Sequence, residues 1–96
     1  MHKVAIRTYA GNYVTAVNGG GMGEAANNLP IHTDAKAIGG WEQFKITFLP
    51  NGHCTIQTHN GNYLTAVNGG GIGGRANTHP VHTDQTTIGP FEKFTL

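Results

Sequence analysis

The chain writes one segment twice, and this duplication limits the folds that it can adopt. Residues 11–21 read GNYVTAVNGGG, and residues 61–71, which lie 50 positions later, read GNYLTAVNGGG. The same offset aligns residues 4–46 with residues 54–96, and roughly half of the aligned residues are identical. A fixed period of this length is typical of proteins that repeat one supersecondary unit. We therefore expect a repeat architecture.

Each repeat alternates strand signals with turn residues and contains no convincing helix. The best strand signal is the one in which Phe44, Ile46 and Phe48 share one face at period two. Gly-Asn, Gly-Gly and Asn-Gly pairs mark the turns, because these residues accept positive φ at little cost. The chain is therefore predicted to be all-β with four short strands per repeat, which in repeat 1 cover residues 3–9, 13–17, 30–34 and 41–48.

A single domain is expected over residues 1–96, with repeat 1 at 3–49 and repeat 2 at 53–96. Repeat 2 should follow the same plan, with a first strand at 54–58 and a fourth strand that ends at Leu96. The turn between the repeats falls at residues 49–52, and residues 22–29 are expected to form a loop.

Charge and hydropathy exclude several classes of partner. Charged residues make up only 11% of the chain and the formal net charge is +1, so we expect no nucleic acid as a partner. The longest apolar runs fall far short of the ~20 residues of a membrane-spanning helix, and Met1-His2-Lys3 lacks the apolar core of a signal peptide. A soluble protein is therefore expected, cytoplasmic if the chain is complete and secreted if it is excised from a larger one.

The motifs at residues 61–64 (GNYL), 68–71 (NGGG) and 88–94 (IGPFEKF) resemble the repeats of fascin-like β-trefoil domains. Those domains pair a Gly-x-Tyr-Leu hairpin with a later Gly-Pro-Trp-Glu-x-Phe strand, and Trp41 stands in repeat 1 where Phe91 stands in repeat 2. The resemblance covers nearly the whole chain. It implies a β-trefoil, and bacterial domains of this kind are often carbohydrate-binding modules attached to secreted hydrolases.

The chain departs from this family in the number of repeats. A β-trefoil has three units that close a six-stranded barrel, and this chain holds two. Four strands alone would leave open edges and a narrow core. The resemblance therefore implies either that the chain is a piece of a longer one or that it is a homo-oligomer. In the second case, three chains would complete two trefoils by exchange at residues 49–52.

The candidate ligand site lies in each repeat at the Asn-Gly-Gly-Gly loop and the His-Thr-Asp triplet. Asp accepts hydrogen bonds from hydroxyl groups, His can donate or accept, and bare glycine backbone permits close approach, which together suit a sugar. In the alternative interpretation, Asp caps a turn and His is solvated at the surface. The predicted ligand-binding residues are Asn18, Gly20, His32 and Asp34 in repeat 1, and Asn68, Gly70, His82 and Asp84 in repeat 2.

Other recurring residues have structural interpretations. Tyr13 and Tyr63 are expected to pack in their hairpins more often than to stack on a sugar. Packing in the core or at the barrel bottom is preferred over ligand contact for the aromatic pair of Trp41 and Phe91. Glu42 and Glu92 are expected to accept backbone hydrogen bonds. Cys54 is expected to be a small buried hydrophobe.

No catalytic, cofactor or metal site is expected. The glycine loops lack the following Lys-Ser/Thr of a phosphate-binding loop, and no nucleophile and base recur as a pair. The His79-Pro-Val-His82 segment with Asp84 has no full counterpart in repeat 1, where Leu29 replaces His79. We therefore predict a lectin-like, multivalent carbohydrate-binding module that is not an enzyme. The alternatives are a fascin-like module that binds protein or cytoskeleton, and a structural repeat that only self-associates.

Overall fold

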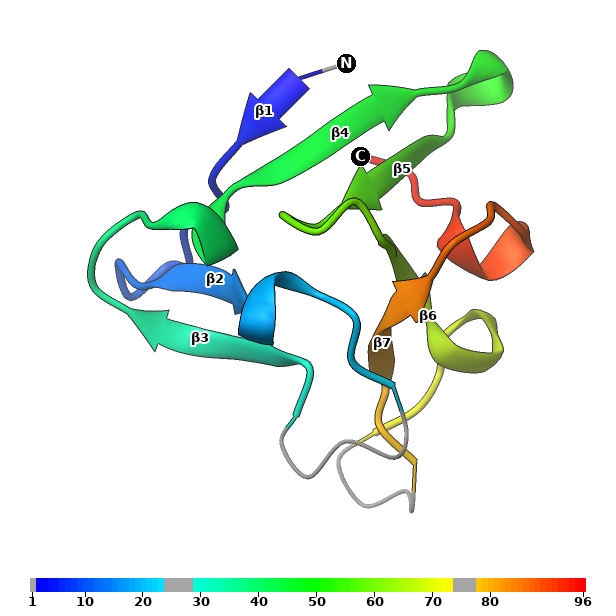
Figure 1. Cartoon of the computed structure of the whole chain (residues 1–96). Coiled ribbons are helices and arrows are strands. Elements are labelled where there is room, and N and C mark those ends of the chain that lie inside the picture. The colour runs from blue at the N-terminus through cyan, green and yellow to red at the C-terminus, as the bar shows by residue number, and fades with distance from the viewer. Residues whose placement is uncertain (1, 24–28, 74–77) are drawn as a thin grey trace.

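The computed structural model describes residues 2–23, 29–73 and 78–96, and this part of the chain is all-β, as predicted (Figure 1). Short strands alternate with single 3₁₀ turns, and no helix among the described residues has the length and apolar character to cross a membrane. The strands are β1 (His2–Val4), β2 (Tyr13–Ala16), β3 (Ile31–Ala35), β4 (Phe44–Phe48), β5 (Cys54–Gln57), β6 (Tyr63–Ala66) and β7 (Val81–Gln85), and the 3₁₀ turns are η1 (Val17–Gly19), η2 (Gly40–Glu42), η3 (Pro50–Gly52), η4 (Val67–Gly69) and η5 (Pro90–Glu92).

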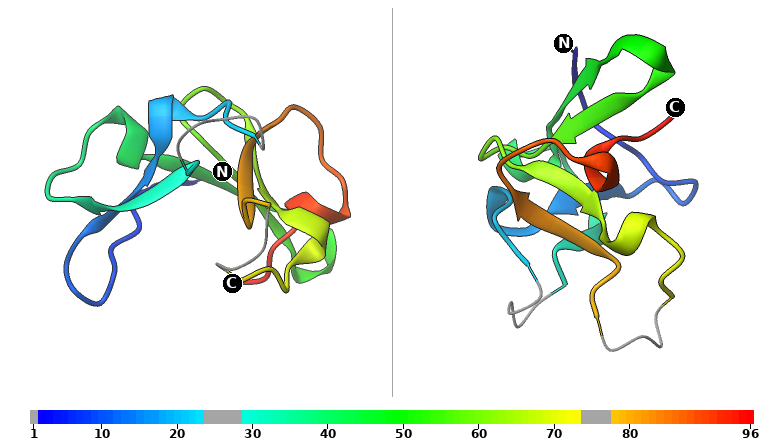
Figure 2. Two further views of the ribbon diagram at one scale, coloured as in Figure 1. Left: turned by 90° about the horizontal axis from the view of Figure 1, so that it is seen from below. Right: turned by 90° about the vertical axis from the view of Figure 1, so that its right-hand side faces the viewer.

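The two repeats fold alike in the hairpin and the turns that follow it. Each repeat has one hairpin, β2–β3 in repeat 1 and β6–β7 in repeat 2. Both hairpins have a bulge in their register. Figure 2 shows these hairpins as two separate lobes on the same side of the molecule. The expected loop over residues 22–29 lies largely outside the described residues.

Strands β1, β4 and β5 lie side by side as one antiparallel series. β5 also pairs with β6, so the hairpin β6–β7 continues the same sheet. β4 pairs with β5 over four residue pairs, from Lys45 and Gln57 to Phe48 and Cys54. The turn η3 that joins them is tight because Asn51 and Gly52 both have positive φ, as the Asn-Gly sequence predicts. A single bridge between Cys54 and Phe94 adds the end of repeat 2 to this series.

The structure corrects three of the expected strands. The first strand is limited to β1. Arg7, which was expected to lie in this strand, forms only a single bridge to Tyr13. The fourth strand of repeat 1 starts at Phe44 because residues 40–42 are coiled into η2. In repeat 2 the fourth strand is reduced to the Phe94 bridge. β4 pairs with a strand on each side, β1 and β5. Among the described residues, Phe94 pairs with β5 alone.

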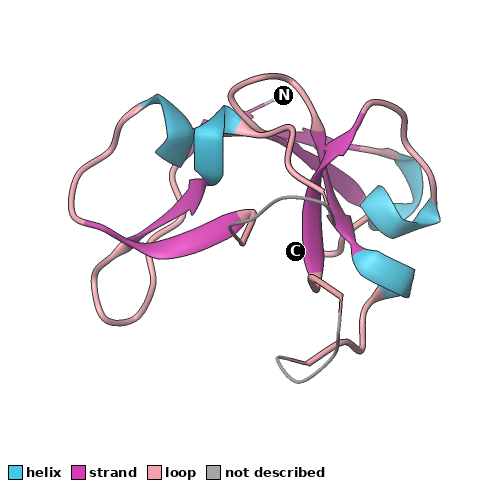
Figure 3. Ribbon diagram, turned by 60° about the horizontal axis from the view of Figure 1, so that its bottom comes forward, coloured by secondary structure: helices cyan, strands magenta, loops and turns pink. Residues whose placement is uncertain are grey.

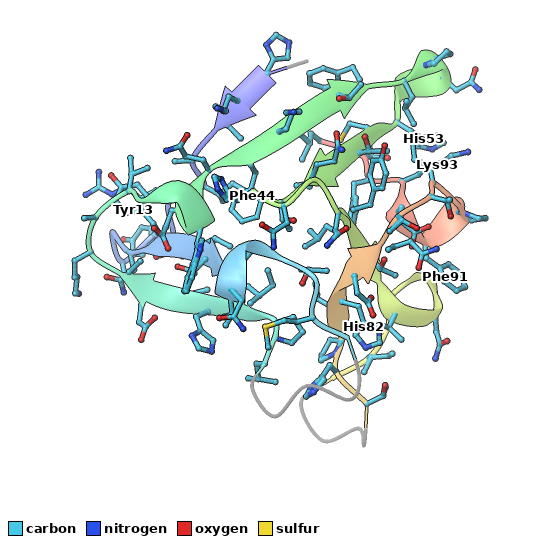
Figure 4. All side chains as sticks on the ribbon, viewed as in Figure 1. Tyr13, Phe44, His53, His82, Phe91 and Lys93 are labelled. Carbon is cyan, nitrogen blue, oxygen red and sulfur yellow. The ribbon has the colours of Figure 1, made fainter. Side chains whose placement is uncertain are left out.

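The core lies between the series β1-β4-β5 and the inner ends of the hairpins. It contains buried residues from both repeats, with Phe44 labelled at its place in Figure 4. Cys54 is 1% exposed, which confirms the prediction of a buried thiol. Phe48 is 59% exposed and contacts the His2 ring edge-on, so only part of the predicted apolar face of β4 is covered. The buried cluster consists of Ala16, Phe44, Ile46, Cys54 and Ile56.

Candidate functional site

The glycine loop of repeat 1 lies against strand β7 of repeat 2. The Thr83 N–H donates a hydrogen bond to the Met22 carbonyl over 2.8 Å, and the Met22 N–H donates to the Thr83 hydroxyl over 3.1 Å. The Gly21 N–H donates to the Thr83 carbonyl. Thr83 is fully buried as a result, although it lies on a strand with exposed neighbours. These bonds join segments more than 60 residues apart, and Figure 3 shows the two lobes that they connect.

The same loop also contacts the turn between β5 and β6. The Asn60 N–H donates to the Gly19 carbonyl over 2.8 Å, and the Asn60 side-chain amide donates to the Asn18 carbonyl over 3.2 Å. Gly20 packs so closely on Thr58 that a Cβ at this position would overlap the threonine side chain. We call this contact the junction; it joins residues 18–23 of repeat 1 to residues 58–62 and 83–84 of repeat 2.

The junction changes how the predicted site residues are grouped. Sequence analysis placed one site inside each repeat, whereas the structure brings the loop of repeat 1 to the His-Thr-Asp triplet of repeat 2. The carboxylate of Asp84 stands beside Gly23, where a Cβ would overlap it. Gly20 is buried in the junction and Asn18 is exposed, with its amide 3.6 Å from the Met22 sulfur.

The remaining predicted residues are not joined in this way. His32 and Asp34 are both exposed on β3. At the other end of the molecule, Asn68 and Gly70 are exposed in the loop of repeat 2, and no described atom lies within 4 Å of a Cβ built on Gly70. A second site of the same kind would need the triplet of repeat 1 and the loop of repeat 2. Both are present in the chain, but they are not brought together.

His82 is half-buried beside the junction, where its position is labelled in Figure 4. Its ring meets the ring of His79 edge-on, with 6.4 Å between the centroids. Within residues 2–23, 29–73 and 78–96, no three His, Cys, Asp or Glu side chains are placed to hold a metal ion.

The recurring glutamates hold each 3₁₀ turn to its hairpin. One carboxylate oxygen of Glu42 accepts a hydrogen bond from the Gly39 N–H over 2.7 Å, and the other accepts from the Thr15 hydroxyl over 2.6 Å. Glu92 makes the same two bonds, to the Gly89 N–H and the Thr65 hydroxyl, over 2.7 Å each. The predicted backbone bonds are confirmed, and the threonine partners show that these carboxylates are structural.

Glu42→Ala is expected to lower the free energy of unfolding by about 2–4 kcal/mol, because it leaves a buried hydroxyl and an N–H without their charged acceptor. Glu42→Gln is the matched control. Its amide oxygen can accept from Gly39 and its NH₂ can donate to the Thr15 hydroxyl, so we expect a loss of about 1 kcal/mol or less. Urea unfolding of both variants measures the difference. Equal losses would contradict this role.

Two aromatic predictions have different outcomes. Trp41 and Phe91 are 46% and 45% exposed, so they do not pack in the core, and their expected packing at a barrel bottom stays a prediction. They stand on η2 and η5, which lift them off the strand, and Phe91 lies beside Gly69 of the nearby loop. Tyr13 is half-buried in its hairpin and carries the Arg7 guanidinium 5.7 Å from its ring centroid.

Sequence reasoning missed the junction residues Thr58, Asn60 and Thr83. Thr58 and Thr83 have identical counterparts in repeat 1, Thr8 and Thr33, so their type gave no sign of a special role. Asn60 is replaced by alanine in repeat 1, and that difference was the available signal.

Neither the protein-family models nor the curated proteins that were compared contain a match to this chain.

Proposed function

We propose that this chain forms two of the three units of a β-trefoil. Strands β1, β4 and β5, together with the bridge at Phe94, have the order expected for four of the six strands of the barrel. The hairpins β2–β3 and β6–β7 correspond to two of the three hairpins that cap such a barrel. The fifty-residue repeat, with the same turns in both copies, supports this assignment.

We further propose that the module binds carbohydrate at the junction. The observation that carries this proposal is the placement of Asp84: its exposed carboxylate stands over the bare backbone of Gly23. Asp84 is exposed on β7, and a carboxylate can accept hydrogen bonds from two hydroxyl donors. His82 lies two residues before it on the same strand and adds a ring that can donate or accept.

Such a site is shallow, and binding at one junction should therefore be weak. Strong attachment to a polysaccharide would require several junctions on one particle, because linked sites raise the effective concentration of each other. This expectation agrees with a repeat protein better than with a single deep active site.

Asp84→Ala should abolish the binding that the native chain shows on a broad glycan array, when both proteins are dilute enough to be single chains. Gln85→Ala is the matched control, because Gln85 is the next exposed residue of β7 and lies outside the junction. Both variants should keep the free energy of unfolding within about 1 kcal/mol, as exposed substitutions usually do.

Two results would contradict the proposal. One is a native chain that is folded and binds no glycan on the array, which would favour the fascin-like, protein-binding alternative. The other is a loss of several kcal/mol in Asp84→Ala, which would show that this carboxylate has a structural role as a cap.

A further inference from the structure

The two repeats use opposite halves of the same contact. Repeat 1 contributes its glycine loop to the junction and leaves the turn before β2 partly exposed, with Tyr9 fully in solvent. Repeat 2 contributes the turn before β6 and leaves its own loop exposed. We call residues 68–73 the loop edge, and residues 8–12 together with Thr33 the turn edge. Each described chain thus carries one loop edge and one turn edge.

Both edges already have the conformation that the junction requires. In the loops, φ is 60° at Asn18 and 58° at Asn68, and 111° at Gly20 and 108° at Gly70. In the turns, φ at the first glycine, residue 11 or 61, is 91° or 86°. Docking would therefore need little rearrangement of either edge, which reduces its entropic cost.

The residues that make the internal contact are also present on the edges. The loops share the sequence Val-Asn-Gly-Gly-Gly, and the backbone donor at position 60 has an equivalent N–H at Ala10. Thr33 is exposed and corresponds to Thr83, which the junction buries completely. The turn residues that are identical in the two repeats are Thr8 and Thr58, Gly11 and Gly61, and Asn12 and Asn62.

An apolar pocket is also placed where a further repeat would pack against this chain. A pocket of about 190 Å³ lies between the starts of β3 and β7, where the Pro-Ile of repeat 1 meets the Pro-Val of repeat 2. A third such segment, arriving with a third repeat, would bring the matching apolar side chains to it. The pocket is lined by Leu29, Pro30, Ile31, Pro80 and Val81.

We propose that a second copy of this chain docks its turn edge on the loop edge and reproduces the junction between molecules. The inference rests on the trefoil part of the proposed function for its stoichiometry: three chains supply the six repeats that fill two trefoils. A rigid pair of repeats spans two of three positions, so closure requires a chain to open at η3, between β4 and β5.

This docking would also complete the second ligand site. The triplet with His32 and Asp34 of one copy would meet the loop of residues 68–73 of another, as Thr83 and Asp84 meet residues 18–23 within one chain. The site at β3 is then shared between subunits and exists only in the assembly.

The test is the solution mass of the full chain, measured without sugar by light scattering from micromolar to millimolar protein. The native chain should approach the mass of three chains of 10.2 kDa each. Thr33→Lys on the turn edge and Ile72→Lys on the loop edge should weaken association about a hundredfold or more, because each buries an unpaired charge. Thr86→Lys adds the same charge where repeat 1 already has Lys36, and it should assemble like the native chain.

A gain-of-function variant keeps the test decisive if a lysine variant fails to fold. Ala10→Asn restores the amide with which Asn60 reaches the Asn18 carbonyl, and it should tighten association about fivefold or more. A native chain of single-chain mass throughout, or Ala10→Asn without any gain, would overturn the inference. So would assembly by folded Thr33→Lys and Ile72→Lys at native strength.

Failure of this inference is distinguishable from failure of the proposed function. A monomer that binds glycans through Asp84 overturns the docking and leaves the carbohydrate proposal standing. An oligomer that is disrupted by the lysine variants and binds no glycan supports the docking and removes the carbohydrate ligand.

Discussion

Phe44→Ala should lower the free energy of unfolding by about 3–5 kcal/mol, the usual loss when a buried aromatic ring is truncated and leaves a cavity. Phe44 is 2% exposed and belongs to the buried cluster with Ile46, Cys54 and Ile56. Its strand is paired on both sides, so the backbone around the cavity has little freedom to collapse into it. A domain of this size has a total stability of only about 5–15 kcal/mol, so the variant should be close to unfolding.

Phe94→Ala is the natural control, because Phe94 occupies the same position in repeat 2 and is only half-buried at the edge of the cluster. A loss of about 1–2 kcal/mol is expected, since part of its surface is already in solvent. Urea unfolding of dilute samples, with circular dichroism as the signal, compares the two. Equal losses would mean that Phe94 is covered by something outside the single chain, or that Phe44 is less important than its burial indicates.

Gly20→Ala is expected to lower stability by about 3 kcal/mol or more, from two separate causes. With φ 111° and ψ −175°, Gly20 occupies a backbone region that is essentially restricted to glycine and costs other residues about 1–3 kcal/mol. The added methyl group would also overlap Thr58, so the junction between the repeats must open to admit it.

Gly70→Ala separates these causes. Gly70 has almost the same backbone angles, φ 108° and ψ −177°, and no described atom lies within 4 Å of its Cβ position. Gly70→Ala should therefore show the backbone strain alone, and Gly20→Ala a larger loss by about 1–3 kcal/mol. Thermal unfolding of dilute protein gives both values. If the two losses were the same, the contact with Thr58 would contribute nothing to stability.

Local features of this fold were predictable from the sequence because their causes are local. The turns at residues 11–12 and 61–62 follow from their Gly-Asn sequence, and the backbone hydrogen bonds of Glu42 and Glu92 from the recurrence of these residues in the two repeats. The strand at residues 3–9 and the fourth strand of repeat 2 were predicted too long. Strand length depends on the partner strand, which a single segment does not reveal.

The candidate site was harder to predict because it depends on how the repeats meet. Thr33 and Thr83 sit in identical triplets, yet one is exposed and the other fully buried. Their difference comes entirely from the loop that lies beside one of them. The spacing of motifs therefore predicted candidate site residues within each repeat, whereas the structure brings the loop of repeat 1 beside the triplet of repeat 2.

The burial of Cys54 gives the molecule its own reporter of opening. The thiol is 1% exposed, and its strand β5 is held between β4 on one side and Phe94 on the other. A thiol reagent can reach it only after β5 separates from one of these neighbours. The labelling rate of the unmodified chain therefore measures how often β5 separates from β4 or from Phe94, at the single cysteine in the sequence.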